Sequence, residues 1–83
     1  MSALLAKKYY ILMERNGVSS EWFTSSSREV YTKRKIDALI RVLKETDAEL
    51  RRLYPSAKSL HTDYCRLPVY ITSRDAKRLN IKE

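Results

Sequence analysis

The clearest pattern of apolar positions lies in residues 33–54, where the spacing matches a helix. At about 100° per residue the apolar side chains converge on one stripe, made of Ile36, Leu39, Ile40, Leu43, Leu50 and Tyr54. Pro55 ends the helix soon afterwards. Asp47 projects toward the stripe, so we expect the stripe to loosen or to reach solvent there.

The start of this helix has two interpretations. Residues 26–29 (Ser-Ser-Arg-Glu) fit a capping box, which would begin the helix near Ser27. Residues 30–32 (Val-Tyr-Thr) suit a strand equally well, and the helix would then begin near Lys33. We expect a boundary between Ser25 and Lys33, and its position stays open.

Two further segments have the composition of strands. Neither face of residues 4–14 is cleanly polar, which predicts a strand that is central or covered on both sides. Asn16-Gly17 follows, a strong hairpin signal because both residues tolerate positive φ, and residues 18–25 would form the return strand. Residues 66–72 predict a third strand, in which Pro68 favours a strand start or an edge.

The end of the chain predicts a second, short helix. Residues 72–75 place a hydroxyl at a cap position and a carboxylate three residues later, so we expect a helix over residues 74–80. Residues 56–63 have the composition of a loop. The order β-β-α-β-α predicts one small α+β domain over residues 1–83, with the long amphipathic helix packed across a mostly antiparallel sheet.

Composition narrows the classes of function. The chain has 83 residues, with 17 Lys and Arg against 10 Asp and Glu, a net charge of +7. The single Gly excludes a glycine-rich phosphate loop, and the single Cys excludes an intramolecular disulfide and a multi-cysteine metal cluster. We find no secretory signal and no apolar run of the roughly 20 residues that a membrane span needs. We therefore expect a cytoplasmic protein with no membrane partner, no cofactor and no metal.

One cluster brings a nucleophile and a base close together in sequence: His61, Asp63, Tyr64 and Cys65. A Cys-His pair activates a thiolate where the two side chains meet. A segment that runs from a loop into a strand has no periodicity that makes them meet. A buried thiol and a surface imidazole explain the same residues, so we expect no catalytic residues and no enzyme.

The basic residues fall into two sets. The first lies on the long helix, opposite the apolar stripe, and comprises Lys33, Arg34, Lys35, Arg41 and Lys44. The second lies toward the C-terminus and comprises Arg66, Arg74, Lys77, Arg78 and Lys82. Arg74, Lys77 and Arg78 share one face of the short C-terminal helix and are the candidate contacts of this set. For the first set a binding surface and a merely solvated face both stay open, because Asp37 and Glu45 stand four residues from cations. If the helix begins at Lys33, three cations in its first turn oppose the macrodipole, a conflict that is typical of functional sites.

These patterns support one hypothesis and one alternative. The first is a non-enzymatic module that binds nucleic acid, RNA in preference to DNA, through the two basic sets. The aromatic side chains that would stack on unpaired bases are Tyr9, Tyr10 and Trp22. The alternative is a protein-binding regulator or inhibitor, of the accessory type found in phages and mobile elements. It would dock on an acidic partner through the edge strand near Pro68 or a Tyr-rich surface, and a homodimer would use the same edge.

Overall fold

The sheet is built around one long strand, β1 (Ala6–Asn16), in a computed structural model that describes residues 6–25 and 29–83. β4 (Thr62–Thr72) pairs antiparallel with β1 along its whole length. Two short strands share the other edge of β1, β2 (Phe23–Thr24) near its end and β3 (Val30–Tyr31) near its middle. β1 is therefore the central strand, as the sequence predicts.

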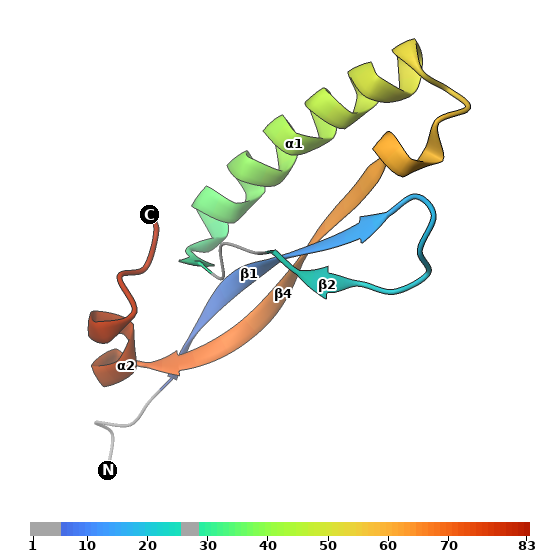
Figure 1. The fold of residues 1–83 in the computed structure, drawn as a ribbon. Helices are drawn as coiled ribbons and strands as arrows, with labels where there is room; N and C mark the ends of the chain where they lie inside the picture. The colour runs from blue at the N-terminus through green and yellow to red at the C-terminus, as the bar shows by residue number, and fades with distance from the viewer. Residues whose placement is uncertain (1–5, 26–28) are drawn as a thin grey trace.

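One long helix, α1 (Lys33–Leu53), runs along this sheet (Figure 1). It begins at Lys33, and the hydroxyl of Thr32 caps it by accepting the N–H of Lys35 at 3.4 Å. The start near Ser27 is wrong, because Val30 and Tyr31 pair with β1 as a strand. Residues 26–28 of the predicted capping box lie outside the described residues.

Two short helical segments flank β4. The 3-10 turn η2 (Lys58–Leu60) precedes it, and α2 (Ser73–Arg78) follows it. Thr72 caps α2 by accepting the N–H of Asp75 at 3.3 Å, which is the cap that the sequence predicts. The order β-β-α-β-α and the α+β class are confirmed, with β3 as an additional short strand.

The core lies between α1 and one face of the sheet. Among the described residues, the buried apolar side chains of this core are Tyr10, Leu12, Tyr31 and Ile36. Leu39, Ile40, Leu43 and Tyr64 pack around them and remain half-buried. The predicted stripe of α1 is thus buried in its N-terminal part, whereas Tyr54 at its end is exposed. Burial of these side chains is the main force that holds the helix on the sheet.

The turn after β1 differs from the predicted tight hairpin. Neither Asn16 nor Gly17 has positive φ, and the strand over residues 18–25 is reduced to the two residues of β2. Gly17 instead lies against the segment before β4, where its N–H donates to the His61 carbonyl at 2.8 Å. A Cβ at Gly17 would stand 2.5 Å from the Lys58 carbonyl oxygen, so close approach explains this glycine.

Two further expectations are corrected. β4 begins at Thr62, four residues before the predicted start, because β1 supplies a pairing partner as far as Asn16. Asp47 does not reach solvent, since only 8% of the residue is exposed. Its carboxylate accepts the N–H of Thr62 at 2.8 Å and so joins α1 to the start of β4.

Candidate nucleic-acid interface

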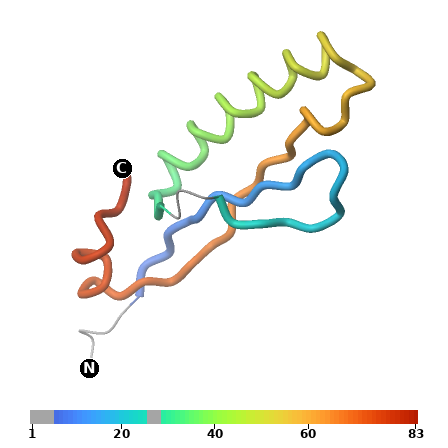
Figure 2. Tube along the Cα trace, viewed as in Figure 1, coloured from blue at the N-terminus to red at the C-terminus, as the bar shows by residue number. Residues whose placement is uncertain are grey.

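Three parts of the chain that are far apart in sequence meet at one end of the molecule. Residue Ala6 at the start of β1 pairs with Thr72, where α2 begins. The C-terminal segment returns to the start of α1, because the N–H of Thr32 donates to the Lys82 carbonyl at 2.9 Å and the N–H of Lys82 donates to the Val30 carbonyl at 2.8 Å. Figure 2 shows the start of α1, α2 and the C-terminal residues gathered at this end. We call residues 6–8, 29–35 and 72–83 the basic end.

The charge of the chain is concentrated at the basic end. It carries nine cations against three anions: Lys7, Lys8, Lys33, Arg34, Lys35, Arg74, Lys77, Arg78 and Lys82 against Glu29, Asp75 and Glu83. The other described residues carry seven cations and seven anions and are neutral as a group. The whole excess of positive charge among the described residues therefore lies at this end.

The cations of the basic end are also mostly without ionic partners. Arg78 pairs with Asp75 at 3.2 Å, and the other eight form no ion pair with any described residue. The predicted residues Lys33, Arg34 and Lys35 of α1 are exposed. So are Arg74 and Lys77 of α2. These side chains are free to contact an anion from solvent.

The first turn of α1 combines charge with free backbone donors. Lys33, Arg34 and Lys35 are its first three residues, and the turn holds no acidic side chain. The N–H groups of the first turn have no carbonyl partner within the helix, and here Thr32 satisfies only that of Lys35. A shallow hollow beside this turn is lined by Thr32, Arg34, Lys35, Ala38 and Glu83. The arrangement suits a phosphate group, which both the cations and the helix dipole attract.

Arg41 and Lys44, the remaining predicted cations of α1, lie farther along the helix and are exposed. Arg34 and Arg41 line one shallow hollow together with Asp37 and Ala38. Asp37 does not neutralise Arg41, because its carboxylate accepts the guanidinium of Arg66 on β4 at 2.5 Å. Neither Arg41 nor Lys44 forms an ion pair within the described residues, so the local pairs expected around Arg41 do not form.

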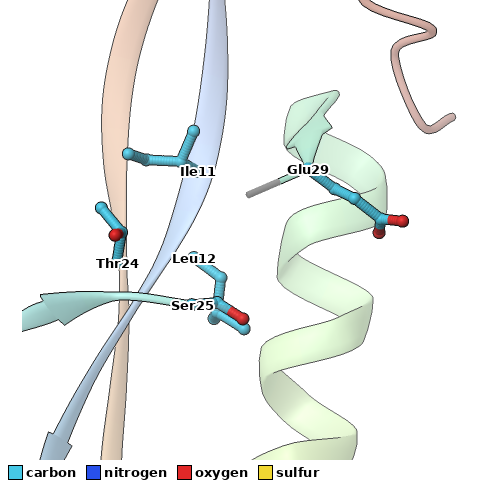
Figure 3. A pocket seen from close by; sticks show the side chains of 5 residues that line it. All are labelled: Ile11, Leu12, Thr24, Ser25 and Glu29. Atoms are coloured by element: carbon cyan, nitrogen blue, oxygen red, sulfur yellow. The ribbon is translucent and has the colours of Figure 1, made fainter. Parts of the chain in front are cut away.

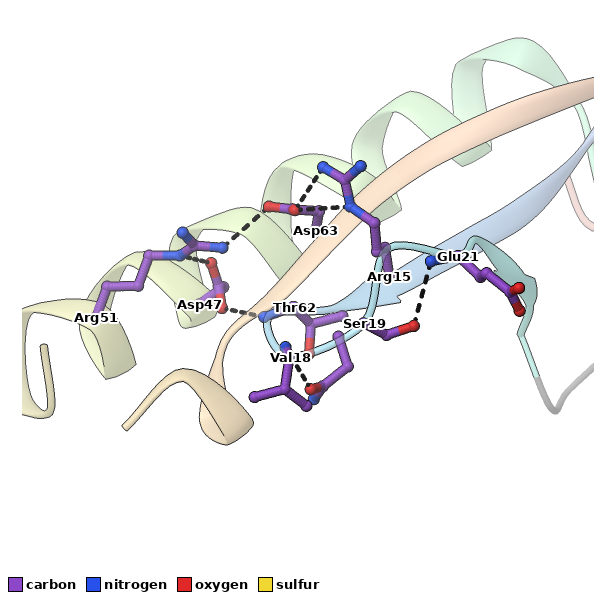
Figure 4. A network of polar contacts seen from close by, with 9 residues as sticks. Arg15, Val18, Ser19, Glu21, Asp47, Arg51, Thr62 and Asp63 are labelled. Atoms are coloured by element: carbon purple, nitrogen blue, oxygen red, sulfur yellow. Dashed lines mark hydrogen bonds and ion pairs between the residues drawn. The ribbon is translucent and has the colours of Figure 1, made fainter. Parts of the chain in front are cut away.

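The opposite end of the molecule holds an ion-pair network (Figure 4). The Asp63 carboxylate accepts a hydrogen bond from the guanidinium of Arg15 at 3.0 Å and another from that of Arg51 at 3.0 Å. The Arg51 guanidinium also pairs with the Asp47 carboxylate at 2.5 Å. The hydrogen bond from Arg15, followed by the charges of both arginines, holds the pKa of Asp63 below its ordinary value. We call residues 14–22 and 47–64 the paired end.

The aromatic residues proposed for stacking do not form one exposed stacking surface. Tyr10 is only 6% exposed, and the Arg66 guanidinium lies 4.6 Å from its ring centroid, so Tyr10 belongs to the core and cannot stack on a base. Trp22 lies at the paired end, where the Arg15 guanidinium stands over its ring, 4.7 Å from the ring centroid. Tyr9 is half-buried on the sheet face opposite Tyr10.

Among the described residues, no hydrogen bond joins His61 to Cys65. His61 is buried, and its Nε2 lies 3.0 Å from the Tyr54 carbonyl oxygen. Burial raises the pKa of the Cys65 thiol, and the opposing influence of Lys44 and Arg15 is smaller. An activated nucleophile needs the opposite shift. No group of three or more His, Cys, Asp and Glu within the described residues is arranged to hold a metal ion.

A small hollow beside β1 offers little room for a ligand. It is lined by Ile11, Leu12, Thr24, Ser25 and Glu29 (Figure 3). Its volume of about 160 Å³ is below the roughly 300–1,000 Å³ of ordinary small-molecule sites. This hollow therefore does not indicate a small-molecule ligand.

Comparison with known proteins adds no family assignment: no family model, no curated protein and no solved structure matches the chain. Among the described helices, none combines the length and the apolar character needed to cross a membrane.

Sequence reasoning placed Lys82 in the second basic set but left Lys7 and Lys8 out of both sets. Lys7 and Lys8 arrive there through the pairing of β1 with β4, and Lys82 arrives through its bridge to Tyr31. These are contacts between residues far apart in sequence, and no local pattern announces them. The pairing register of β1 with β4 would have revealed Lys7, because it places Lys7 opposite Ile71, two residues before α2.

Proposed function

We propose that this chain is a non-enzymatic module that binds nucleic acid through the basic end, with the first turn of α1 as its main phosphate contact. The observation that carries the proposal is the distribution of charge. The basic end has a net charge of +6 within the described residues, and eight of its nine cations have no ionic partner there. Such cations release condensed counterions when they meet phosphates, which provides affinity.

RNA is the preferred ligand in this proposal. The two helices of the chain are separated by the whole of β4, an arrangement unlike a helix-turn-helix that reads the major groove. The stacking contribution expected from Tyr10 is withdrawn because that ring is buried. Affinity would therefore come mainly from phosphates. If about five are contacted on a single strand, the slope of log K against log salt should be about −3.5.

Fluorescence anisotropy with a labelled single-stranded RNA, and with a DNA of the same sequence, tests the proposal over a series of salt concentrations. The variant is the double substitution Lys33→Gln/Arg34→Gln at the basic end. Its matched control is Arg52→Gln/Lys58→Gln at the paired end, which also removes one exposed Lys and one exposed Arg. The first variant should lower affinity at low salt by about tenfold or more and flatten the salt slope by about 1.4. The control should change affinity by less than about twofold.

Two outcomes would contradict the proposal. Absence of binding to either nucleic acid at low salt would end it. An equal loss in both double variants would mean that total charge, rather than the basic end, attracts the ligand. A stronger affinity for the DNA would overturn only the preference for RNA.

An acidic protein partner is the second candidate, favoured by the exposure of β4. Tyr70 is 69% exposed beside Pro68, and no described strand pairs with the outer edge of β4. Tyr is a frequent anchor residue in protein interfaces. Under the nucleic-acid proposal Tyr70→Ala should leave RNA affinity unchanged, whereas a protein-binding role through this edge would make Tyr70 essential for capture of the partner.

A further inference from the structure

The sheet face that points away from the core is largely apolar, and α1 packs on the opposite, core face. Tyr10 and Leu12 point toward α1, so their neighbours along β1 point the other way. With the residues of β4 that share this face they form what we call the outer face: Tyr9, Ile11 and Met13 on β1, and Cys65, Leu67, Val69 and Ile71 on β4. β1 packs against its strand partners, η2 and α1, and α1 lies on the core face.

The chain is more elongated than a closed domain of its length. The extents are 55 × 22 × 15 Å, and the smallest leaves room for one helix layer and one sheet layer. The radius of gyration is 15.4 Å, whereas a chain of this length in a closed domain has about 12 Å. The chain is elongated because its apolar side chains are spread along one sheet face and one helix rather than gathered in a closed core.

The accessible area leads to the same conclusion in quantitative terms. The chain exposes 6390 Å², whereas a folded monomer of its mass exposes about 5,200 Å². The excess of roughly 1,200 Å² exceeds the approximately 800 Å² that each partner buries in an interface of standard size. An interface of standard size would therefore remove most of this excess.

We propose that a second copy of this chain covers the outer face, with the two sheets stacked face to face about a two-fold axis perpendicular to the strands. Along the two long strands this face carries charge only near its ends, at Lys7 and at the Arg15–Asp63 pair. A charged partner would find little to bind between them, whereas an identical apolar face is complementary in size and chemistry.

Charge also determines the direction of the stack. With the strands of the two copies antiparallel, the basic end of one copy lies beside the paired end of the other. The paired end carries four cations and five anions, so it attracts an end with a net charge of +6. A parallel stack would place two basic ends together. Two sheets that face each other in this way pack about 10 Å apart and cross at about 30°.

Pairing through the edge of β4, the homodimer expected from the sequence, fits the structure less well. Pro68 stands in the middle of this strand, opposite Tyr10 of β1. Proline has no N–H, so a second β4 laid along the free edge would lose a hydrogen bond at the centre of the new ladder. The outer face has no such defect.

Sedimentation velocity and light scattering of the full chain, without nucleic acid, test the dimer. We expect a mass of twice 9.8 kDa at micromolar concentration. Leu67→Glu, at a residue that is 44% exposed in the single chain, should raise the dimer dissociation constant by more than about 100-fold. The matched control is Val42→Glu on the outer side of α1, where 55% of the residue is exposed and the dimer should be unchanged. If Leu67→Glu fails to fold by circular dichroism, Leu67→Ser takes its place with an expected increase of about tenfold.

Pro68→Val separates the face from the edge. It restores the missing N–H of β4, so it should strengthen an edge-paired dimer and leave a face-stacked dimer unchanged. The proposal is overturned if the wild-type chain is monomeric at all accessible concentrations, if Val42→Glu rather than Leu67→Glu separates the copies, or if Pro68→Val tightens the dimer. None of these results bears on nucleic-acid affinity, so the two proposals stand or fall separately.

Discussion

The basic end and the paired end use the same types of side chain in opposite ways. At the paired end three of the four cations have a carboxylate partner, and Asp63 alone joins Arg15 on β1 to Arg51 on α1. At the basic end only Arg78 is paired, although this end has nine cations. The charges of the paired end therefore hold elements together, while those of the basic end remain available to solvent or to a ligand.

The two ends also differ in what their charges do to stability. The paired end buries Asp47 with its hydrogen bonds satisfied, so that the carboxylate connects α1 to the start of β4. The basic end places three cations in the first turn of α1, where the helix dipole disfavours them. Substitutions should therefore lower stability at the paired end and raise it at the basic end, and this difference in sign can be tested.

The largest effect is expected for Asp47→Ala at the paired end. The substitution leaves the Thr62 N–H without its acceptor and removes the buried carboxylate that Arg51 contacts. The free energy of unfolding should fall by about 3 kcal/mol, measured from the midpoint of urea denaturation.

Two variants control this experiment. Glu45→Ala removes an exposed acid of the same helix that has no ion pair among the described residues, and it should change stability by less than about 0.5 kcal/mol. Asp47→Asn keeps an acceptor for the Thr62 N–H and should recover part of the loss. Equal stability of Asp47→Ala and Glu45→Ala would show that the network has no structural role.

Gly17→Ala should have the next largest effect. The added Cβ would stand 2.5 Å from the Lys58 carbonyl and 3.3 Å from the Cβ of His61, so the turn after β1 must move away from the segment before β4. We expect a loss of about 2 kcal/mol in the free energy of unfolding. Ser20→Ala, an exposed position in the same loop, is the control and should be close to neutral. An unaffected Gly17→Ala variant would mean that the two segments are not held in contact.

The elements that the sequence predicted well are those whose signals are local. The helical spacing after Lys33 and the hydroxyl cap at Thr72 each depend on residues within a few positions, and both are confirmed. The errors arise where a distant segment decides. Gly17 suggested a tight turn, but its neighbour is Lys58, and Asp47 suggested an opening toward solvent, but Thr62 covers it.

The candidate interface was predictable only in part for the same reason. The exposure of Lys33, Arg34 and Lys35 follows from helical periodicity. Their lack of partners does not, because Asp37 turns to Arg66 on another element instead of to a cation four residues away. The burial of Tyr10 likewise depends on which face of β1 the helix covers, and neither face of that strand is cleanly polar.

Lys35→Glu should sharpen the contrast by raising stability at the basic end. Lys35 is the third residue of α1, and a Glu there would complete a capping box with Thr32 while removing a cation that opposes the dipole. The free energy of unfolding should rise by about 0.5–1 kcal/mol, and RNA affinity should fall. Lys35→Met removes the charge but adds no capping oxygen, so it should gain less. A loss of stability in Lys35→Glu would contradict the strain assigned to this turn.

The smallest effect concerns the pH dependence of the paired end, tested by comparing the wild type with Asp63→Asn. The hydrogen bond from Arg15 and the nearby Arg51 lower the pKa of Asp63 in the folded chain from its ordinary value of 3.8. A lowered folded pKa means that the ionised carboxylate stabilises the fold above pH 3.8, and that this contribution is lost as the pH falls through the folded pKa. The difference in stability between the two proteins should therefore be constant near neutral pH and close in acid. If the difference in stability between wild type and Asp63→Asn persists unchanged at acidic pH, the ion pairs of Asp63 do not stabilise the paired end. The contrast in stability between the paired end and the basic end would then depend on Asp47 alone.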